Sequence, residues 1–125
     1  MARRRSIFVV AGSIAEKSAN PKMPSNTSAV IADDGSIVAA YRKIHLFDVN
    51  IPDGARYAES EVVLPGDKVV VVPTALGRIG LTICYDLRFP ELYRKLASLG
   101  AEVITIPAAF TLFTGKDHWE VLVRA

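Results

Sequence analysis

The sequence predicts an α/β domain, or a layered α+β domain, on three observations. Short β-branched apolar runs alternate with turn-forming residues, a pattern typical of buried strands. A stretch with leucines at helical spacing stands between two of these runs, and a strand–helix–strand order favours a right-handed crossover between parallel strands. The chain has 125 residues, of which 50% are hydrophobic, and this suits one hydrophobic core.

The first part of the chain is predicted to form a strand and a hairpin. Residues 6–12 (SIFVVAG) are an apolar β-branched run, whereas residues 13–27 are polar, contain prolines and predict a loop. Residues 28–32 and 36–41 are predicted strands on either side of Asp33-Asp34-Gly35. The Asp-Gly step favours a tight hairpin because glycine readily takes a positive φ.

The middle of the chain predicts a long loop and then two strands. Residues 42–67 contain several prolines and glycines and have no sustained period. A loop of that length in a compact domain is usually functional or disordered. Residues 68–73 (KVVVVP) and 79–85 (IGLTICY) are predicted strands, joined by a short turn that ends at Gly77.

The last part of the chain predicts a helix, a strand and the beginning of another helix. Residues 90–99 favour a helix because Pro90 suits a first helical turn and leucines recur at helical spacing. Gly100 suits the end of that helix. Residues 101–107 (AEVITIP) predict a buried strand, and residues 119–125 predict a helix that the end of the chain cuts short.

Charge, apolar runs and cysteine content exclude several classes of protein. A formal net charge of +2 is too small to indicate a nucleic-acid partner. Arg3-Arg4-Arg5 before an apolar run is similar to the front of a signal peptide, but Gly12-Ser13 interrupts that run, which favours an ordinary first strand. No run approaches the length of a membrane span. One cysteine forms no intrachain disulfide, so we expect a reducing, cytoplasmic location.

Cys84 is the candidate nucleophile. It stands at the end of a predicted strand shortly before a helix, at the sheet edge where α/β proteins bind ligands. A nearby helix N-terminus or lysine would favour the reactive thiolate. The alternative is a small core residue, which a lone cysteine after an apolar strand more often is.

Dispersed motifs extend this interpretation to a family. Residues 80–91 (GLTICYDLRFPE) closely resemble the nucleophile segment of the nitrilase superfamily of carbon–nitrogen hydrolases. Three further stretches resemble other parts of that family, in the right order. Residues 41–48 (YRKIHLFD) resemble its lysine segment, and Glu59-Ser60 with residues 64–67 (LPGD) resembles its acidic loop. Residues 107–111 (PAAFT) and 114–120 resemble its pocket-lining stretch. The resemblance covers nearly the whole chain from Ile7 onward.

The resemblance implies three catalytic residues. Cys84 would attack the substrate carbonyl carbon, and Lys43 would place positive charge at the developing oxyanion, assisted by the backbone N–H just after Cys84. Glu59 would hold the lysine, and Glu61 is the competing choice for that position. Without the motifs, Lys43 would be interpreted as a solvated loop lysine and Glu59 as a surface carboxylate.

The same resemblance implies that residues 1–125 form a partial domain. The general-base glutamate of the family lies upstream of anything in these residues, and Glu16 aligns better with a later segment, so it is not assigned as the base. The complete domain is a longer, four-layer α-β-β-α sandwich, of which this chain would be the central portion with the lysine and cysteine motifs. Missing strands would leave apolar faces exposed.

The closest resemblance is to the Nit-type branch, with its deaminated glutathione amidases and ω-amidases, and it implies a small linear amide substrate. Arg88 could bind a substrate carboxylate through its guanidinium fork, or form a salt bridge with Asp86 or Glu91. The residues expected to contact substrate are Tyr85, Arg88, Phe110, Thr111 and Thr114. Nitrilases and N-carbamoyl hydrolases share this machinery and remain alternatives.

No metal or organic cofactor is expected, because His45 and His118 lack partners at metal-ligand spacing and no phosphate-binding glycine loop is present. His118 is better explained as a structural hydrogen-bonding residue than as a proton shuttle. Family members commonly assemble, so the full-length form is expected to be a homo-oligomer. The alternative from another class is a non-catalytic fragment or pseudoenzyme that acts through a partner chain.

Overall fold

The computed structural model describes residues 1–50, 54, 56–110 and 115–125. An antiparallel sheet in the order β1-β2-β3 is built from the N-terminal part, after a short helical turn, α1 (Ala2–Arg5). Its strands are β1 (Val9–Glu16), β2 (Ser25–Ile31) and β3 (Ile37–Arg42). The predicted hairpin between the second and third strands is confirmed, and Gly35 in its turn has a φ of 88°.

A second sheet has the order β6-β7-β8 and carries the predicted crossover. It is formed by β6 (Val71–Thr74), β7 (Gly77–Leu81) and β8 (Val103–Thr105). The connection from β7 to β8 contains a 3-10 segment, η2 (Cys84–Arg88), and then α2 (Pro90–Ser98). Strands β7 and β8 are parallel, as the strand–helix–strand order predicts.

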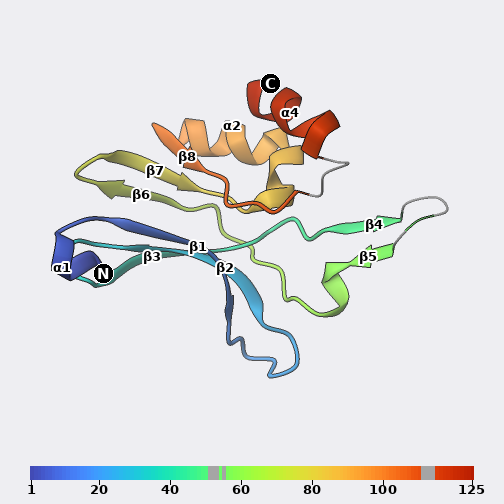
Figure 1. Cartoon of the computed structure of the whole chain (residues 1–125), viewed down its shortest axis with the longest axis horizontal. Coiled ribbons are helices and arrows are strands. Elements are labelled where there is room, and N and C mark those ends of the chain that lie inside the picture. The colour runs from blue at the N-terminus through green and yellow to red at the C-terminus, as the bar shows by residue number, and fades with distance from the viewer. Residues whose placement is uncertain (51–53, 55, 111–114) are drawn as a thin grey trace.

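The two sheets lie face to face, and α2 covers the outer side of the second one (Figure 1). Val30 and Tyr41 of the first sheet belong to the same buried cluster as Val72, Ile79 and Leu81 of the second. Gly80 allows α2 to lie close, because a Cβ there would stand 3.2 Å from Leu96 Cδ2. This arrangement is of the α/β class and leaves the loop after β7 at the rim of the second sheet.

The prediction that residues 42–67 form one long loop is wrong in part. This stretch contains a short antiparallel pair, β4 (Asp48–Asn50) with β5 (Arg56–Ala58), and one 3-10 turn, η1 (Glu59–Glu61). In Figure 1 this pair extends away from the two sheets. Strands of three residues carry too little periodicity to be distinguished from loop in a sequence.

Other predicted boundaries also differ from the structure. The loop predicted over residues 13–27 is shorter, because β1 continues through an irregularity between Ala11 and Ile14, where Ser13 has a φ of 61°. The strand predicted over residues 79–85 ends at Leu81, since η2 begins at Cys84. At the C-terminus a π-helical turn, η3 (Gly115–Trp119), precedes α4 (Glu120–Arg124), so the predicted helix is present.

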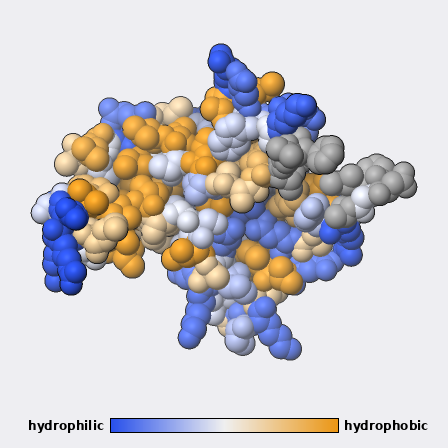
Figure 2. All heavy atoms as spheres, in the orientation of Figure 1, coloured by the Kyte–Doolittle hydropathy of each residue, from blue (hydrophilic) through white to orange (hydrophobic). Residues whose placement is uncertain are grey.

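Large apolar side chains remain on the surface. Figure 2 shows hydrophobic residues gathered on the visible face over the region of the two sheets. Exposed apolar residues on or beside these strands include Ile7, Ile37, Val38, Leu76 and Val103. Within the described part of the chain, no helix is both long enough and apolar enough to cross a bilayer.

Replacing Ser28 by alanine is expected to raise the free energy of unfolding by about 1 kcal/mol, since an unsatisfied buried hydroxyl carries its full desolvation penalty. Ser28 is 0% exposed, and its Oγ has no hydrogen-bond partner among the described residues. Urea unfolding of the intact protein measures the change. Thr27→Val in the same strand is the matched control: Thr27 Oγ1 donates to Glu16 Oε2 at 2.7 Å, so this variant should lose stability. A loss of stability in Ser28→Ala would contradict the prediction.

Candidate active site

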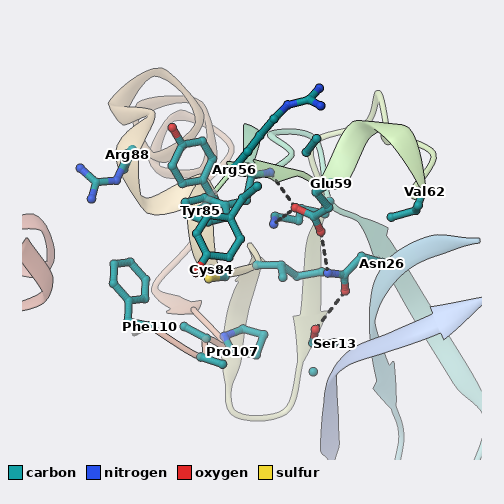
Figure 3. A pocket seen from close by; sticks show the side chains of 18 residues that line it. Ser13, Asn26, Arg56, Glu59, Val62, Cys84, Tyr85, Arg88, Pro107 and Phe110 are labelled. Carbon is teal, nitrogen blue, oxygen red and sulfur yellow. Dashed lines mark hydrogen bonds and ion pairs between the residues drawn. The ribbon is translucent and has the colours of Figure 1, made fainter. Parts of the chain in front are cut away.

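A cavity of ≈ 720 Å³ opens at the rim of the second sheet, where the segment after β7 meets the β4–β5 region, the middle of β1 and the start of β2. Cys84, Lys43 and Glu59 all line it, although they lie on three different segments of the chain. Figure 3 shows Tyr85, Cys84 and Phe110 along one wall and Asn26 with Glu59 along the other. The cavity therefore unites the three residues to which the resemblance assigns catalysis.

Cys84 is held in a strained turn between a strand and a helical segment. Its φ is 50°, in the left-handed region that non-glycine residues rarely adopt, and such strain is most often found at functional sites. The Cys84 N–H donates to Pro107 O at 3.0 Å, and Ile83 just before it is fully buried. Cys84 is partly buried, packs against the core cluster and also lines the cavity, so it is not sealed inside the core.

Lys43 is a buried cation. It follows the end of β3, is 3% exposed, and donates from Nζ to Glu59 Oε2 at 2.6 Å. Its backbone is held at both ends, because the Lys43 N–H donates to Asn26 O at 2.8 Å and its carbonyl accepts from Gly66 N at 2.8 Å. The alternative of a solvated loop lysine is therefore wrong.

Glu59 accepts hydrogen bonds through both carboxylate oxygens. Phe47 N donates to Oε2 at 2.7 Å, beside Lys43 Nζ, and Asn26 Nδ2 donates to Oε1 at 3.3 Å. Buried ion pairs are tolerated when hydrogen bonds satisfy the remaining lone pairs in this way. The alternative of a plain surface carboxylate is wrong for Glu59, whereas Glu61 is exposed and pairs with Arg56.

Sequence reasoning missed several polar residues of the cavity, among them Ser13 and Asn26. Ser13 Oγ donates to Asn26 Oδ1 at 3.0 Å, and this bond orients the Asn26 amide toward Glu59, as the dashed lines in Figure 3 show. Both residues fall in the stretch predicted as a polar loop. Only the pairing of β1 with β2 brings them together, and neither residue type carries a local signal for that register.

Three of the five residues expected to contact substrate line the cavity. They are Tyr85, Arg88 and Phe110; Thr111 and Thr114 lie outside the described residues. The Tyr85 ring packs edge-on against Phe47, with centroids 5.0 Å apart. The cavity wall beside the thiol is therefore aromatic and apolar, which suits a small organic substrate.

Arg88 does not form either of the salt bridges considered for it. Asp86 is fully buried and bonds to other residues, and Glu91 pairs with Arg94 at 3.0 Å. The Arg88 guanidinium donates instead from Nη2 to His118 Nδ1 at 2.7 Å. Since Arg88 pairs with no carboxylate among the described residues, this guanidinium can still attract an anion in the cavity.

Glu16 lies in a different environment from Glu59. It pairs with Arg42 at 2.7 Å, and the hydrogen bond from Arg42 is the main reason that the pKa of Glu16 is below its ordinary value. Among the described residues that line the cavity, Glu59 is the one with an acidic side chain. The geometry thus offers a thiol, a buried ammonium and one carboxylate already engaged with that ammonium.

Comparison with known proteins gives consistent matches along the entire chain. A family model described as carbon-nitrogen hydrolase matches residues 1–125. Deaminated glutathione amidase from Synechocystis is 48% identical over 100% of this chain and 47% of its own length. Human omega-amidase is 43% identical over 100% of this chain and 45% of its own length. The chain thus spans about half the length of these curated relatives.

Solved structures match as well. The Caenorhabditis elegans NitFhit protein superposes with a TM-score of 0.90 and 43% identity, over 98% of this chain and 30% of that one. A mutant of the amidase from Nesterenkonia sp. AN1, with acrylamide added at its active-site cysteine, has a TM-score of 0.74 and 27% identity, over 92% of this chain and 42% of that one.

Proposed function

The chain belongs to the carbon–nitrogen hydrolase family, and from this premise we propose that it cleaves a small linear amide with Cys84 as nucleophile and ammonia as leaving group. One observation carries the proposal above all others: the partly buried Cys84 and the buried Lys43 ammonium line one cavity, although they are 41 positions apart in the sequence. A charged lysine is costly to bury and is retained where it has a partner or a task.

The reaction runs in two halves. The Cys84 sulfur attacks the amide carbon, and the carbonyl oxygen becomes an oxyanion that Lys43 Nζ and the Tyr85 N–H stabilise. That N–H lies in the first turn of η2, where helical N–H groups lack intrahelical acceptors. The carbon–nitrogen bond then breaks, the nitrogen leaves as ammonia after protonation, and a thioester to Cys84 remains. Water adds to the thioester and releases the carboxylic acid and the free thiol.

Glu59 holds the lysine in this scheme. Its Oε2 accepts from Lys43 Nζ and Phe47 N together, which fixes the direction of the ammonium. The base that takes the thiol proton is proposed to be the upstream glutamate of the family pattern. The active-site cysteine named for the Nesterenkonia amidase supports the assignment to Cys84, the single cysteine of this chain.

Detection of the thioester tests the proposed function. The intact protein is mixed with a panel of an ω-amide, a nitrile and an N-carbamoyl compound, quenched in acid, and measured by intact mass and by ammonia release. We expect a mass increase equal to the acyl group, located on the peptide with Cys84, and ammonia release from the ω-amide. Ammonia release that survives complete alkylation of Cys84 would overturn the mechanism, and absence of any turnover would favour a non-catalytic role.

We propose the ω-amide of an α-keto acid as the substrate class, with Arg88 binding its carboxylate. The names of the deaminated glutathione amidase and omega-amidase relatives support this choice. Arg88→Gln is expected to raise KM for the anionic ω-amide by about 10- to 100-fold. This factor corresponds to the binding free energy of one charge-assisted hydrogen-bonded pair. A neutral amide of the same length is the control, and its KM should stay unchanged. Equal losses for both substrates would exclude a role in binding the carboxylate.

We also propose that the intact protein self-associates and works in the cytoplasm without a cofactor. Exposed apolar residues on or beside the strands, such as Ile37 at 71% and Leu76 at 75%, support burial against further protein. A reaction that depends on a free thiol suits a reducing compartment.

A further inference from the structure

Asp86, two residues after Cys84, is a fully buried carboxylate that lies outside the cavity wall. It accepts four hydrogen bonds within the described part of the chain. Its partners are Ile83 N at 2.8 Å and Tyr41 Oη at 2.7 Å on Oδ2, and His45 N at 3.1 Å with His45 Nδ1 at 2.7 Å on Oδ1. An unpaired buried carboxylate is expensive, so four donors on one group indicate a built arrangement.

The four donors come from two segments that carry the two reactive groups. Tyr41 and His45 stand two residues before and two residues after Lys43, whereas Ile83 directly precedes Cys84. Tyr41 Oη also accepts from Ile44 N at 3.3 Å, so the whole turn around the lysine is tied to one carboxylate. Asp86 therefore links the lysine turn to the cysteine turn from behind the cavity.

The charges and rings around Asp86 make this link rigid. Burial, aided by the negative charge of Asp86, raises the pKa of Tyr41 far above its usual range, so its hydroxyl stays protonated and donates. Asp86 Oδ1 is contacted by both the backbone N–H and the ring Nδ1 of His45, at 3.1 and 2.7 Å. The His45 ring is stacked on Phe89, with centroids 3.7 Å apart and planes 8° apart, and Phe89 directly follows η2.

The other contacts of Lys43 do not connect it to the turn that carries Cys84. Its backbone bonds to Asn26 and Gly66, and its side-chain bond to Glu59, connect it to the first sheet and to neighbouring loops. The Cys84 backbone is held by Pro107. Among the residues that the structure describes, Asp86 is the side chain that hydrogen-bonds to both turns, because it shares η2 with Cys84 and accepts from both flanks of Lys43.

We propose that Asp86 is a positioning residue, which sets the placement of the Lys43 ammonium relative to the Cys84 sulfur and thereby the rate of acylation. This inference rests on the proposed function of the same cavity. Reacting groups misplaced by about 1 Å can lose a factor of about 10² in rate. Since Asp86 does not line the cavity, its loss should change kcat and leave KM nearly unchanged.

Asp86→Asn is the informative substitution because it keeps the shape and removes one acceptor. If the amide oxygen faces His45, the amide NH2 group faces Tyr41 Oη and Ile83 N. The tyrosine hydroxyl can rotate to accept, but the Ile83 N–H cannot, and two donors then face each other beside Cys84. Leu96→Ala is the matched control: it removes a fully buried side chain of α2 that takes no part in the Asp86 network.

The experiment measures kcat and KM for ammonia release by the intact protein and its variants, at a temperature where circular dichroism shows each one folded. Asp86→Asn is expected to lose about 100-fold in kcat with KM within about three-fold of wild type, while Leu96→Ala loses stability but keeps its kcat. If Asp86→Asn does not fold, Tyr41→Phe removes one of the four bonds and should lose about ten-fold in kcat.

The outcomes separate this inference from the proposed function. An unchanged kcat in folded Asp86→Asn or Tyr41→Phe, beside an active wild type, overturns the role of Asp86 alone. If Leu96→Ala loses as much kcat as Asp86→Asn, the effect of Asp86 is one of general stability, and its positioning role is also overturned. A wild type that releases no ammonia and forms no acyl adduct overturns both.

Discussion

Replacing Cys84 by alanine is expected to abolish ammonia release, with a loss on the order of 10⁴- to 10⁶-fold in kcat. The sulfur forms the bond to the substrate carbon, and no other thiol exists in the chain to replace it. Alanine keeps the Cβ and takes the same left-handed backbone, so the turn before η2 should persist and the loss should be chemical. The measurement is steady-state turnover, together with intact mass after an acid quench.

Cys84→Ser serves as the control for that variant, because a hydroxyl of similar size keeps the shape of the turn and is a weaker nucleophile at neutral pH. Both variants should bind substrate with nearly wild-type affinity and show the wild-type circular dichroism spectrum. Cys84→Ala should form no acyl adduct that survives denaturation. Turnover above about one per cent of wild type in Cys84→Ala would refute the assignment of the nucleophile.

Lys43→Met is the second large effect that we expect, and it acts on both activity and stability. Activity should fall by at least about 10²–10³ in kcat, because the oxyanion loses a preorganised positive charge. The free energy of unfolding should fall by about 3–5 kcal/mol, because Glu59 keeps a partly buried charge without its cation. Turnover assays and urea unfolding of the intact protein measure the two effects.

A double variant separates the two effects of Lys43. Glu59→Gln added to Lys43→Met removes the unpaired charge, so much of the lost stability should return while activity stays low. Lys22→Met, at an exposed lysine, changes the net charge equally and should leave both quantities as in wild type. Recovery of activity in the double variant would show that Lys43 acts through stability alone.

Local patterns predicted those elements whose signal lies within a few residues. The Asp-Gly step predicted the β2–β3 hairpin, and apolar runs around a leucine-spaced helix predicted the parallel β7–β8 pair. The motifs likewise indicated Cys84, Lys43 and Glu59, which the structure brings to one cavity. The hairpin and the parallel pair are confirmed because a turn glycine and a helical period are both properties of adjacent residues.

Features that depend on distant partners were missed. The β4–β5 pair, the extension of β1 past Ser13, and the contribution of Asn26 to the cavity all arise from pairing between segments. Asp86 belongs to the same class, since a carboxylate after a cysteine looks like one side of a surface salt bridge until Tyr41 and His45 are seen to bond to it.

The amino-acid sequence by itself determined the longer strands and the crossover helix, the candidate thiol and ammonium group, and the resemblance that relates them. The tertiary structure alone decided that Lys43 is buried, that Cys84 takes a left-handed φ, and that both face one cavity. The physical reason is range: periodicity and turn chemistry act over a few residues, whereas burial and backbone strain are set by the contacts between two packed sheets.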